Sequence, residues 1–135
     1  MDAEKYTQGM QGTLGAHLGI RFVELSKERV TAELTIHDLL LNLSGVVHGG
    51  TLMAFADTVG AVGTIMNLPD GASTATIESK TNFFAAGRRG TLHAESLPLH
   101  IGSRTMVWQT RVTDDTGRLV SMTVQTQIVI PAKAD

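Results

Sequence analysis

The segment Gly50–Met66 constrains the fold more than any other part of the chain, because it is apolar or small on every side and carries one charge, Asp57. Apolarity around the whole circumference predicts a helix enclosed by protein rather than one lying on a surface. A helix of this length spans about 25 Å, the width of a small domain. Gly60, Ala61 and Gly63 weaken helix propensity but permit close backbone approach by a packed neighbour.

Alternation of apolar and polar residues on both sides of this segment predicts β-strands. We expect them at 20–25, 29–36, 73–84, 91–100, 104–113 and 118–130. Residues 3–16 predict a short N-terminal helix, with a loosely ordered extension over 1–14 as the alternative. Short connections favour antiparallel pairing. The order β-β-α-β-β-β-β therefore predicts an α+β fold, an antiparallel sheet wrapped around one long buried helix at about 50–66.

Side chains alternate along a strand, so the sequence also predicts which residues share a face. In 118–130 one face carries Val120, Met122, Val124, Thr126, Ile128 and Ile130, and the other carries Ser121, Thr123, Gln125 and Gln127. In 73–84 the same rule places Thr76 on the face opposite Ile77 and Phe83.

Composition excludes several classes of protein. The 135 residues predict one domain over 1–135, and 42% hydrophobic with 18% charged residues excludes a disordered chain. A formal net charge of −2 argues against nucleic acid or an anionic membrane as a partner. The absence of cysteine excludes disulfides and thiolate catalysis. A polar N-terminus and the lack of an apolar run of about twenty residues predict a cytoplasmic protein.

The stretch from Asn42 to Gly50 leads directly into the helix and contains the first candidate site. The first N–H groups of a helix have no partner within it and carry the positive end of its dipole. Glycine at Gly49 and Gly50 lets a substrate oxygen approach these groups, which suits a carbonyl that becomes negative during acyl transfer. A simple tight turn into the helix explains the same glycines equally well.

Asp57 is the second candidate, because a carboxylate on an apolar helix costs several kcal/mol unless it is paired or kept for chemistry. The alternative is an Asp satisfied by neighbouring backbone or hydroxyl groups. Gly49 and Asp57 lie ~12 Å apart along one helix and about 80° apart around it. One chain cannot bring both to the same carbonyl carbon, whereas two antiparallel helices from neighbouring protomers can. We therefore predict a homo-oligomer built from a C₂ dimer with composite sites.

Asn42 and His48 admit two interpretations each. Asn42 holds a water or the carboxylate, or it is an ordinary turn asparagine. His48 is a general base or, as we favour, a structural residue that hydrogen-bonds the helix start. The other histidines lack metal-ligand spacing, so we predict no metal.

Three arginines next to glycines suit phosphate binding, with a solvated loop as the alternative. Arg88 and Arg89 stand between Gly87 and Gly90, and Arg104 follows Gly102-Ser103. We expect these basic residues to cluster. An apolar pocket for a substrate is expected to be lined by Met53, Phe55, Val59 and Met66.

The motif Asn42-x-x-Gly45-x-x-His48-Gly49-Gly50, followed by Ala56-Asp57, resembles the hotdog-fold acyl-CoA thioesterases of the phenylacetate-pathway (PaaI-like) type. The stretches 76–90 and 102–120 also resemble this family. The resemblance implies a hotdog fold and, commonly in the family, a dimer of dimers.

The resemblance also implies roles. Asp57 would be the nucleophile or the base that activates water, and the Gly49 N–H of the opposite protomer would polarise the thioester carbonyl. Asn42 would orient the attacking group, His48 would support the turn, and Thr76 would assist the water. The remaining site residues, which would bind substrate or the phosphates of CoA, are Gly50, Arg88, Arg89, Ser103 and Arg104.

The function predicted from sequence is hydrolysis of an aryl or medium-chain acyl-CoA to the free acid and CoA. It needs no cofactor, since CoA is part of the substrate. A non-catalytic acyl-CoA sensor or scaffold is the first alternative, although such a protein has no need of the buried Asp57. A hotdog hydratase or dehydratase is the second, although His48 and Asp57 lack the arrangement that chemistry requires.

Overall fold

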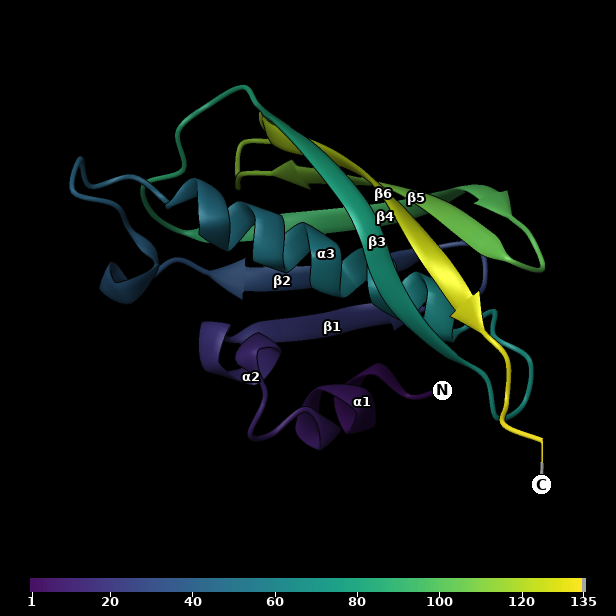
Figure 1. Cartoon of the computed structure of the whole chain (residues 1–135). Helices are drawn as coiled ribbons and strands as arrows, with labels where there is room; N and C mark the ends of the chain where they lie inside the picture. Colours follow the sequence, from purple (N-terminus) through teal and green to yellow (C-terminus); the bar gives the residue numbers. More distant parts are fainter. Residues whose placement is uncertain (135) are drawn as a thin grey trace.

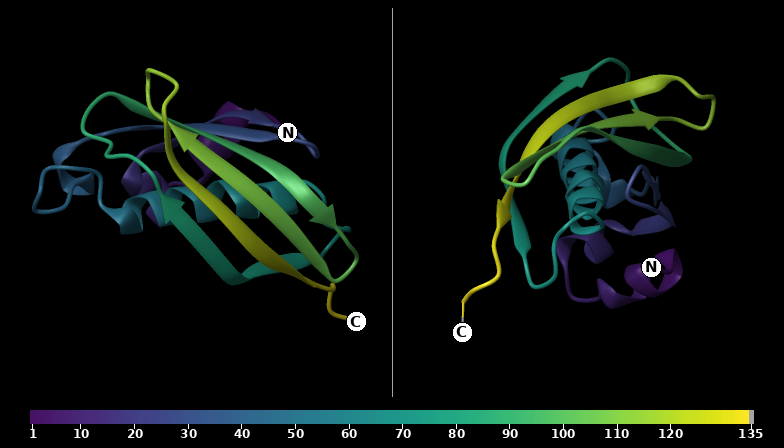
Figure 2. Two further views of the ribbon diagram at one scale, coloured as in Figure 1. Left: turned by 90° about the horizontal axis from the view of Figure 1, so that it is seen from above. Right: turned by 90° about the vertical axis from the view of Figure 1, so that its right-hand side faces the viewer.

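The structure, a computed structural model, describes residues 1–134; Asp135, the last residue of the predicted domain, lies outside them. Its centre is helix α3 (Gly49–Ile65), which lies across one face of a six-stranded antiparallel sheet (Figure 1). Seen along the helix, the sheet curls around it (Figure 2). The predicted α+β arrangement is confirmed.

The strands run within one residue of their predicted limits. They are β1 (Ile20–Leu25), β2 (Val30–Thr35), β3 (Ser73–Phe83), β4 (Thr91–Ile101), β5 (Thr105–Thr113) and β6 (Leu119–Ile130). Their order in the sheet is β1-β2-β4-β5-β6-β3. The chain therefore crosses from β2 over α3 to β3 at the far edge, and then returns to β4 beside β2.

The N-terminal segment forms two short helices, α1 (Ala3–Gly9) and α2 (Leu14–Leu18), where a single helix was predicted. The break falls at Gly12, whose φ of 83° is incompatible with a continuous α-helix. Thr13 then caps α2 by accepting the Ala16 N–H. The Tyr6 ring meets Phe22 of β1 edge-on at 5.2 Å between centroids, so α1 packs against this edge strand.

One flank of α3 is packed against apolar side chains. Phe55, Val59 and Val62 are buried in a cluster with residues of β1, β2 and β4. The prediction that Phe55 and Val59 line a substrate pocket is therefore wrong. Both side chains are fully enclosed in the core.

The other flank is packed through glycines against β5 and β6. A Cβ on Gly60 would lie 2.2 Å from the Gln125 Oε1, and one on Gly63 would lie 2.7 Å from the Trp108 ring. The predicted close approach at these glycines is confirmed. The face of β6 that meets the helix is the polar one: Ser121, Thr123, Gln125 and Gln127 are all fully buried.

The remaining side of α3 is open, so the prediction of a helix enclosed all around is wrong. The row Met53, Asp57, Ala61 and Ile65 stays accessible, with Met53 39% and Ile65 38% exposed. The reason lies in the sheet, which ends at β3 and leaves nothing in residues 1–134 to cover this row.

Strand β3 contains a bulge between Thr76 and Glu78, with Ile77 left unpaired. Thr76 pairs with Gln127, and Phe83 pairs with Ser121. Both partners lie on the inner face of β6, so Thr76 and Phe83 also share the inner face. The prediction that they lie on opposite faces is wrong, because the extra residue reverses the alternation.

Candidate active site

The start of α3 leaves one backbone donor free. His48 is the N-cap residue, and its Nδ1 accepts the Gly50 N–H at 2.7 Å. In residues 1–134 the Gly49 N–H makes no hydrogen bond. The Phe83 ring lies 3.3 Å from where a Cβ of Gly49 would stand. The helix therefore presents one N–H, with the positive end of its dipole, beneath an aromatic ring.

Asn42 lies in the loop before this helix and is satisfied within that loop. Its Oδ1 accepts the Ser44 N–H at 2.9 Å and the Val46 N–H at 3.3 Å. Gly45 completes the turn with a φ of 74°. This geometry is that of the turn asparagine, the second of the two interpretations.

Asp57 lies on the border between the open side of α3 and the polar flank, and it is half-buried. Its Oδ1 accepts two hydrogen bonds, from the Thr76 hydroxyl at 2.6 Å and from Gln125 Nε2 at 3.0 Å. The Thr76 Oγ1 in turn accepts from Gln127 Nε2 at 2.5 Å. The structure thus brings Asp57 and Thr76 together, with two glutamines behind them.

Gln125 and Gln127 were not identified as site residues from sequence. The available signal was their regular spacing with Ser121 and Thr123 on one face of the last strand. Alternation predicts that these four side chains share a face, but it does not predict that this face lies against α3.

The structure does not bring Gly49 and Asp57 together within one chain. They lie on one uninterrupted helix, ~12 Å apart along its axis, as predicted.

The predicted cluster of basic residues is not formed. Arg88 and Arg89 lie in the loop before β4, and Ser103 and Arg104 lie in the turn after it. Eleven residues of extended strand separate the two groups by roughly 33 Å (Figure 1). The first loop adjoins the start of α3, since the Gly87 carbonyl accepts the Val47 N–H at 2.8 Å. Arg88 and Arg89 are therefore near the helix start, and Arg104 is at the far end of the sheet.

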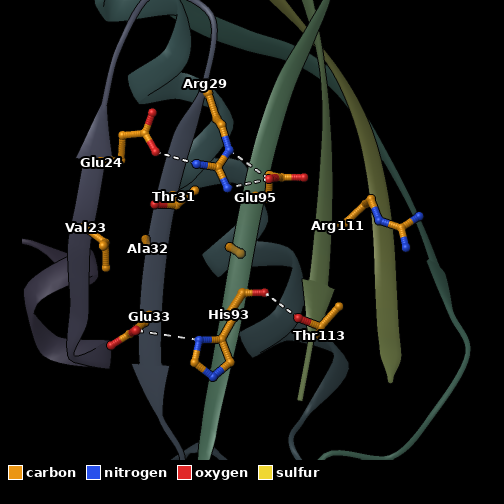
Figure 3. Close-up of a pocket in the computed structure, with 11 residues that line it drawn as sticks. Val23, Glu24, Arg29, Thr31, Ala32, Glu33, His93, Glu95, Arg111 and Thr113 are labelled. Atoms are coloured by element: carbon orange, nitrogen blue, oxygen red, sulfur yellow. Dashed lines mark hydrogen bonds and ion pairs between the residues drawn. The ribbon is translucent and has the colours of Figure 1, made fainter. Parts of the chain in front are cut away.

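A hollow of about 430 Å³ lies on the outer face of the sheet, away from α3 (Figure 3). Its charges are largely paired with one another: Arg29 lies 2.5 Å from Glu24 and 2.7 Å from Glu95. His93 at its edge contacts Asp115 at 2.9 Å. This hydrogen bond, followed by one from the Thr91 N–H, lowers the pKa of Asp115. The hollow contains none of the predicted catalytic residues.

No three His, Cys, Asp or Glu side chains within residues 1–134 are grouped so that they could hold a metal ion. Nor does this part of the chain contain a helix long and apolar enough to cross a membrane.

Comparison with known proteins identifies the family. Residues 44–121 match the model of the thioesterase superfamily. A putative esterase of Mycobacterium tuberculosis is 32% identical over 109 residues, which cover 78% of this chain and 78% of that protein. The chain belongs to the thioesterase superfamily. A 1,4-dihydroxy-2-naphthoyl-CoA hydrolase of Escherichia coli is 28% identical over 109 residues, covering 81% of this chain and 80% of that protein.

Solved structures agree on the fold of this thioesterase. A thioesterase from Haemophilus influenzae superimposes with a TM-score of 0.94 at 23% identity, covering 99% of this chain and 94% of that one. The PaaI protein of the phenylacetic acid degradation operon of Escherichia coli gives 0.85 at 21% identity, covering 96% and 93%. These structures confirm the predicted hotdog fold, and the match to the thioesterase superfamily confirms the assignment as a thioester hydrolase.

Proposed function

We propose that this thioesterase hydrolyses acyl-CoA with Asp57 as the nucleophile or general base. The observation that carries the proposal is the second oxygen of Asp57. In residues 1–134 no donor contacts Oδ2, while Oδ1 accepts two hydrogen bonds. Oδ2 is free to attack a carbonyl or to take a proton from water, and Asp57 is only half-buried within the single chain.

The Gly49 N–H is the proposed oxyanion donor, contributed by a second protomer. A single chain holds Gly49 and Asp57 ~12 Å apart on one helix, too far for one carbonyl group. A second copy placed antiparallel would cover the row Met53, Asp57, Ala61 and Ile65 and bring its own Gly49 toward Asp57. The free edge of β3, beside this row, supports such a dimer.

Arg88 and Arg89 are the proposed ligands of CoA phosphates, because their loop adjoins the start of α3. Ser103 and Arg104 lie at the far end of β4 and would reach the same CoA only from another copy of the chain. In this proposal Asn42 and His48 shape the loop that leads into α3, and Gly50 forms part of the first turn of that helix.

An aryl acyl group is favoured over an aliphatic one. Phe83, 50% exposed, lies against Gly49, and Phe84 beside it is also exposed. An aromatic acyl group stacks favourably on such rings. The Escherichia coli relative named for 1,4-dihydroxy-2-naphthoyl-CoA supports the same class of substrate.

Free-thiol release from a panel of aryl- and alkyl-CoA thioesters tests the reaction, comparing the wild type with Asp57→Asn. We expect turnover to fall by a hundredfold or more, the order expected when a principal catalytic group is lost. Retained turnover in Asp57→Asn would refute the role of Asp57. CoA binding without thiol release in the wild type would instead favour a sensor, and alkene formation from a hydroxyacyl-CoA would favour a dehydratase.

The composite site has its own test, which uses Gly49→Pro to remove the N–H. Proline is tolerated at the first position of a helix, and His48 before it already has the extended conformation (ψ 136°) that proline requires. Gly49→Ala is the matched control, since it adds a Cβ but keeps the N–H. Co-expressing Gly49→Pro with Asp57→Asn should restore about one quarter of wild-type activity, because half of randomly formed dimers have one intact site. No restoration would refute the shared site.

A further inference from the structure

A network of hydrogen bonds from buried side-chain amides holds Asp57 in place. Gln125 is fully buried, and its Nε2 donates both to Asp57 Oδ1 at 3.0 Å and to the Asp57 backbone carbonyl at 3.2 Å. Its Oε1 is buried without a hydrogen-bond partner. The Gln125 amide therefore makes both of its hydrogen bonds to Asp57, while its own acceptor oxygen is left without a partner.

Gly60 makes this orientation possible. The Gln125 Oε1 occupies the space where a Cβ of Gly60 would lie, only 2.2 Å away. Reversing the amide would set its oxygen against the acceptors of Asp57, so the network fixes which end of the amide faces the carboxylate.

The proton of the Thr76 hydroxyl is fixed by a similar argument. Gln127 is also fully buried, and its Nε2 donates to Thr76 Oγ1 at 2.5 Å. The Thr74 hydroxyl lies 3.0 Å from the Gln127 Oε1 and 2.9 Å from the Ile128 carbonyl, and its one hydrogen serves one of these acceptors. A hydroxyl has one hydrogen, and with a donor already on its oxygen Thr76 directs that hydrogen to Asp57 Oδ1 at 2.6 Å.

We infer that Gln125 and Gln127 are positioning residues that select Oδ2 of Asp57 as the reacting atom. Gln125 acts directly on Oδ1, and Gln127 acts through Thr76. Two donors on Oδ1 fix the rotation of the carboxylate and leave Oδ2 without a hydrogen bond in residues 1–134. Thr76 serves as a donor to Asp57 and not as the group that holds the attacking water. This inference rests on the proposed role of Asp57.

Three variants test it against a matched control. Gln125→Leu and Thr76→Val each remove one donor to Oδ1, and Thr76→Ser should restore it. Thr81→Val removes a hydroxyl from the same strand and inner face, one that bonds Thr123 at 2.7 Å and not Asp57. We expect kcat to fall about tenfold to a hundredfold in the first two, with KM within about threefold of wild type. Thr76→Ser and Thr81→Val should keep kcat near wild type.

A double-mutant cycle separates positioning from general damage to the fold. In an Asp57→Asn background, Gln125→Leu should lower the residual turnover no further, because its effect passes through the carboxylate. An equal fall in both backgrounds, or an unchanged kcat in Gln125→Leu, would overturn the inference while leaving the role of Asp57 intact. Retained activity in Asp57→Asn alone would instead overturn the proposed function. If Gln125→Leu does not fold, Thr76→Val carries the same cycle.

Discussion

The two flanks of α3 pack against different kinds of side chain, although both flanks face the same sheet. On the flank facing β1, β2 and β4, Phe55, Val59 and Val62 are fully enclosed by apolar side chains. On the flank facing β5 and β6, glycines of the helix meet Trp108, Gln125 and other buried polar side chains. The first flank supplies hydrophobic stabilisation, and the second holds the carboxylate of Asp57.

The polar flank gives up stability that the apolar flank retains. Four buried side-chain polar atoms have no hydrogen-bond partner in residues 1–134. They belong to Thr64 of α3, Trp108 of β5, and Ser121 and Gln125 of β6. An unsatisfied buried group costs about 1–3 kcal/mol. The residues that stabilise the fold and those that hold Asp57 therefore lie on different flanks of one helix. Substitutions on the apolar flank should change the free energy of unfolding more than kcat.

The largest effect on stability should follow truncation of the apolar flank. Phe55→Ala should lower the free energy of unfolding by about 3–5 kcal/mol, because Phe55 is fully buried and a cavity would remain. Urea unfolding measures this loss, and kcat of the folded enzyme should stay within a few-fold of wild type. Leu14→Ala, at a 62% exposed position of α2, is the control and should cost far less. A large fall in kcat for Phe55→Ala would contradict the separation.

Filling the glycine contact on the other flank should have a smaller effect. Gly63→Ala gains about 1 kcal/mol of helix propensity, but its Cβ would lie 2.7 Å from the Trp108 ring. Overpacking costs about 1–3 kcal/mol, so we expect a net loss of between zero and about 2 kcal/mol in urea unfolding. Greater stability in this variant would mean that Trp108 moves freely, against the close packing described.

Two buried threonines of α3 allow a direct comparison of a hydroxyl without a hydrogen-bond partner and a hydroxyl with one. The buried hydroxyl of Thr64 has no partner, so Thr64→Val should stabilise the protein by about 1 kcal/mol. The Thr51 hydroxyl donates to the Leu40 carbonyl at 3.1 Å, so Thr51→Val should destabilise it by about 1 kcal/mol. Urea unfolding of both variants gives the two signs. The same sign in both would contradict the distinction.

The smallest effect should come from the exposed hydrogen bond between His93 and Asp115, outside both flanks. The pKa of Asp115 is lowered from 3.8, chiefly by His93, so its charge stabilises the folded state above that pH. This contribution is lost as the pH falls through the depressed pKa. Asp115→Asn keeps an acceptor for the Thr91 N–H but removes the charge. We expect a slightly lower Tm than wild type at pH 7 and a smaller difference near pH 3, with thiol release unchanged.

Much of the fold could be predicted from the sequence because periodicity carries it. Alternation gave strand limits within one residue, and the continuous apolarity of 50–66 gave the helix. Asp57 stood out as the one charge in that helix, and Gly60 and Gly63 as points of close contact. These features are local, so a single sequence contains them.

The rest depends on relations between segments that periodicity does not contain. Alternation grouped Gln125 with Gln127 but could not indicate that polar side chains face the helix. The bulge in β3 reversed the face of Thr76 relative to Phe83. The arginines at 88, 89 and 104 share flanking glycines, but β4 holds them at opposite ends of the sheet.

The bulge in β3 also determines where the length of this chain can change. Ile77 has no partner in β6, whereas Thr76 and Glu78 pair with the consecutive residues Gln127 and Thr126. A chain lacking Ile77 would therefore keep regular pairing on both sides, with Thr76 still facing Asp57 and Phe83 still facing Gly49. Only the local bend would be lost. Loss of any other residue of β3 would turn one part of the strand over, so a gap in an alignment of this strand belongs at Ile77.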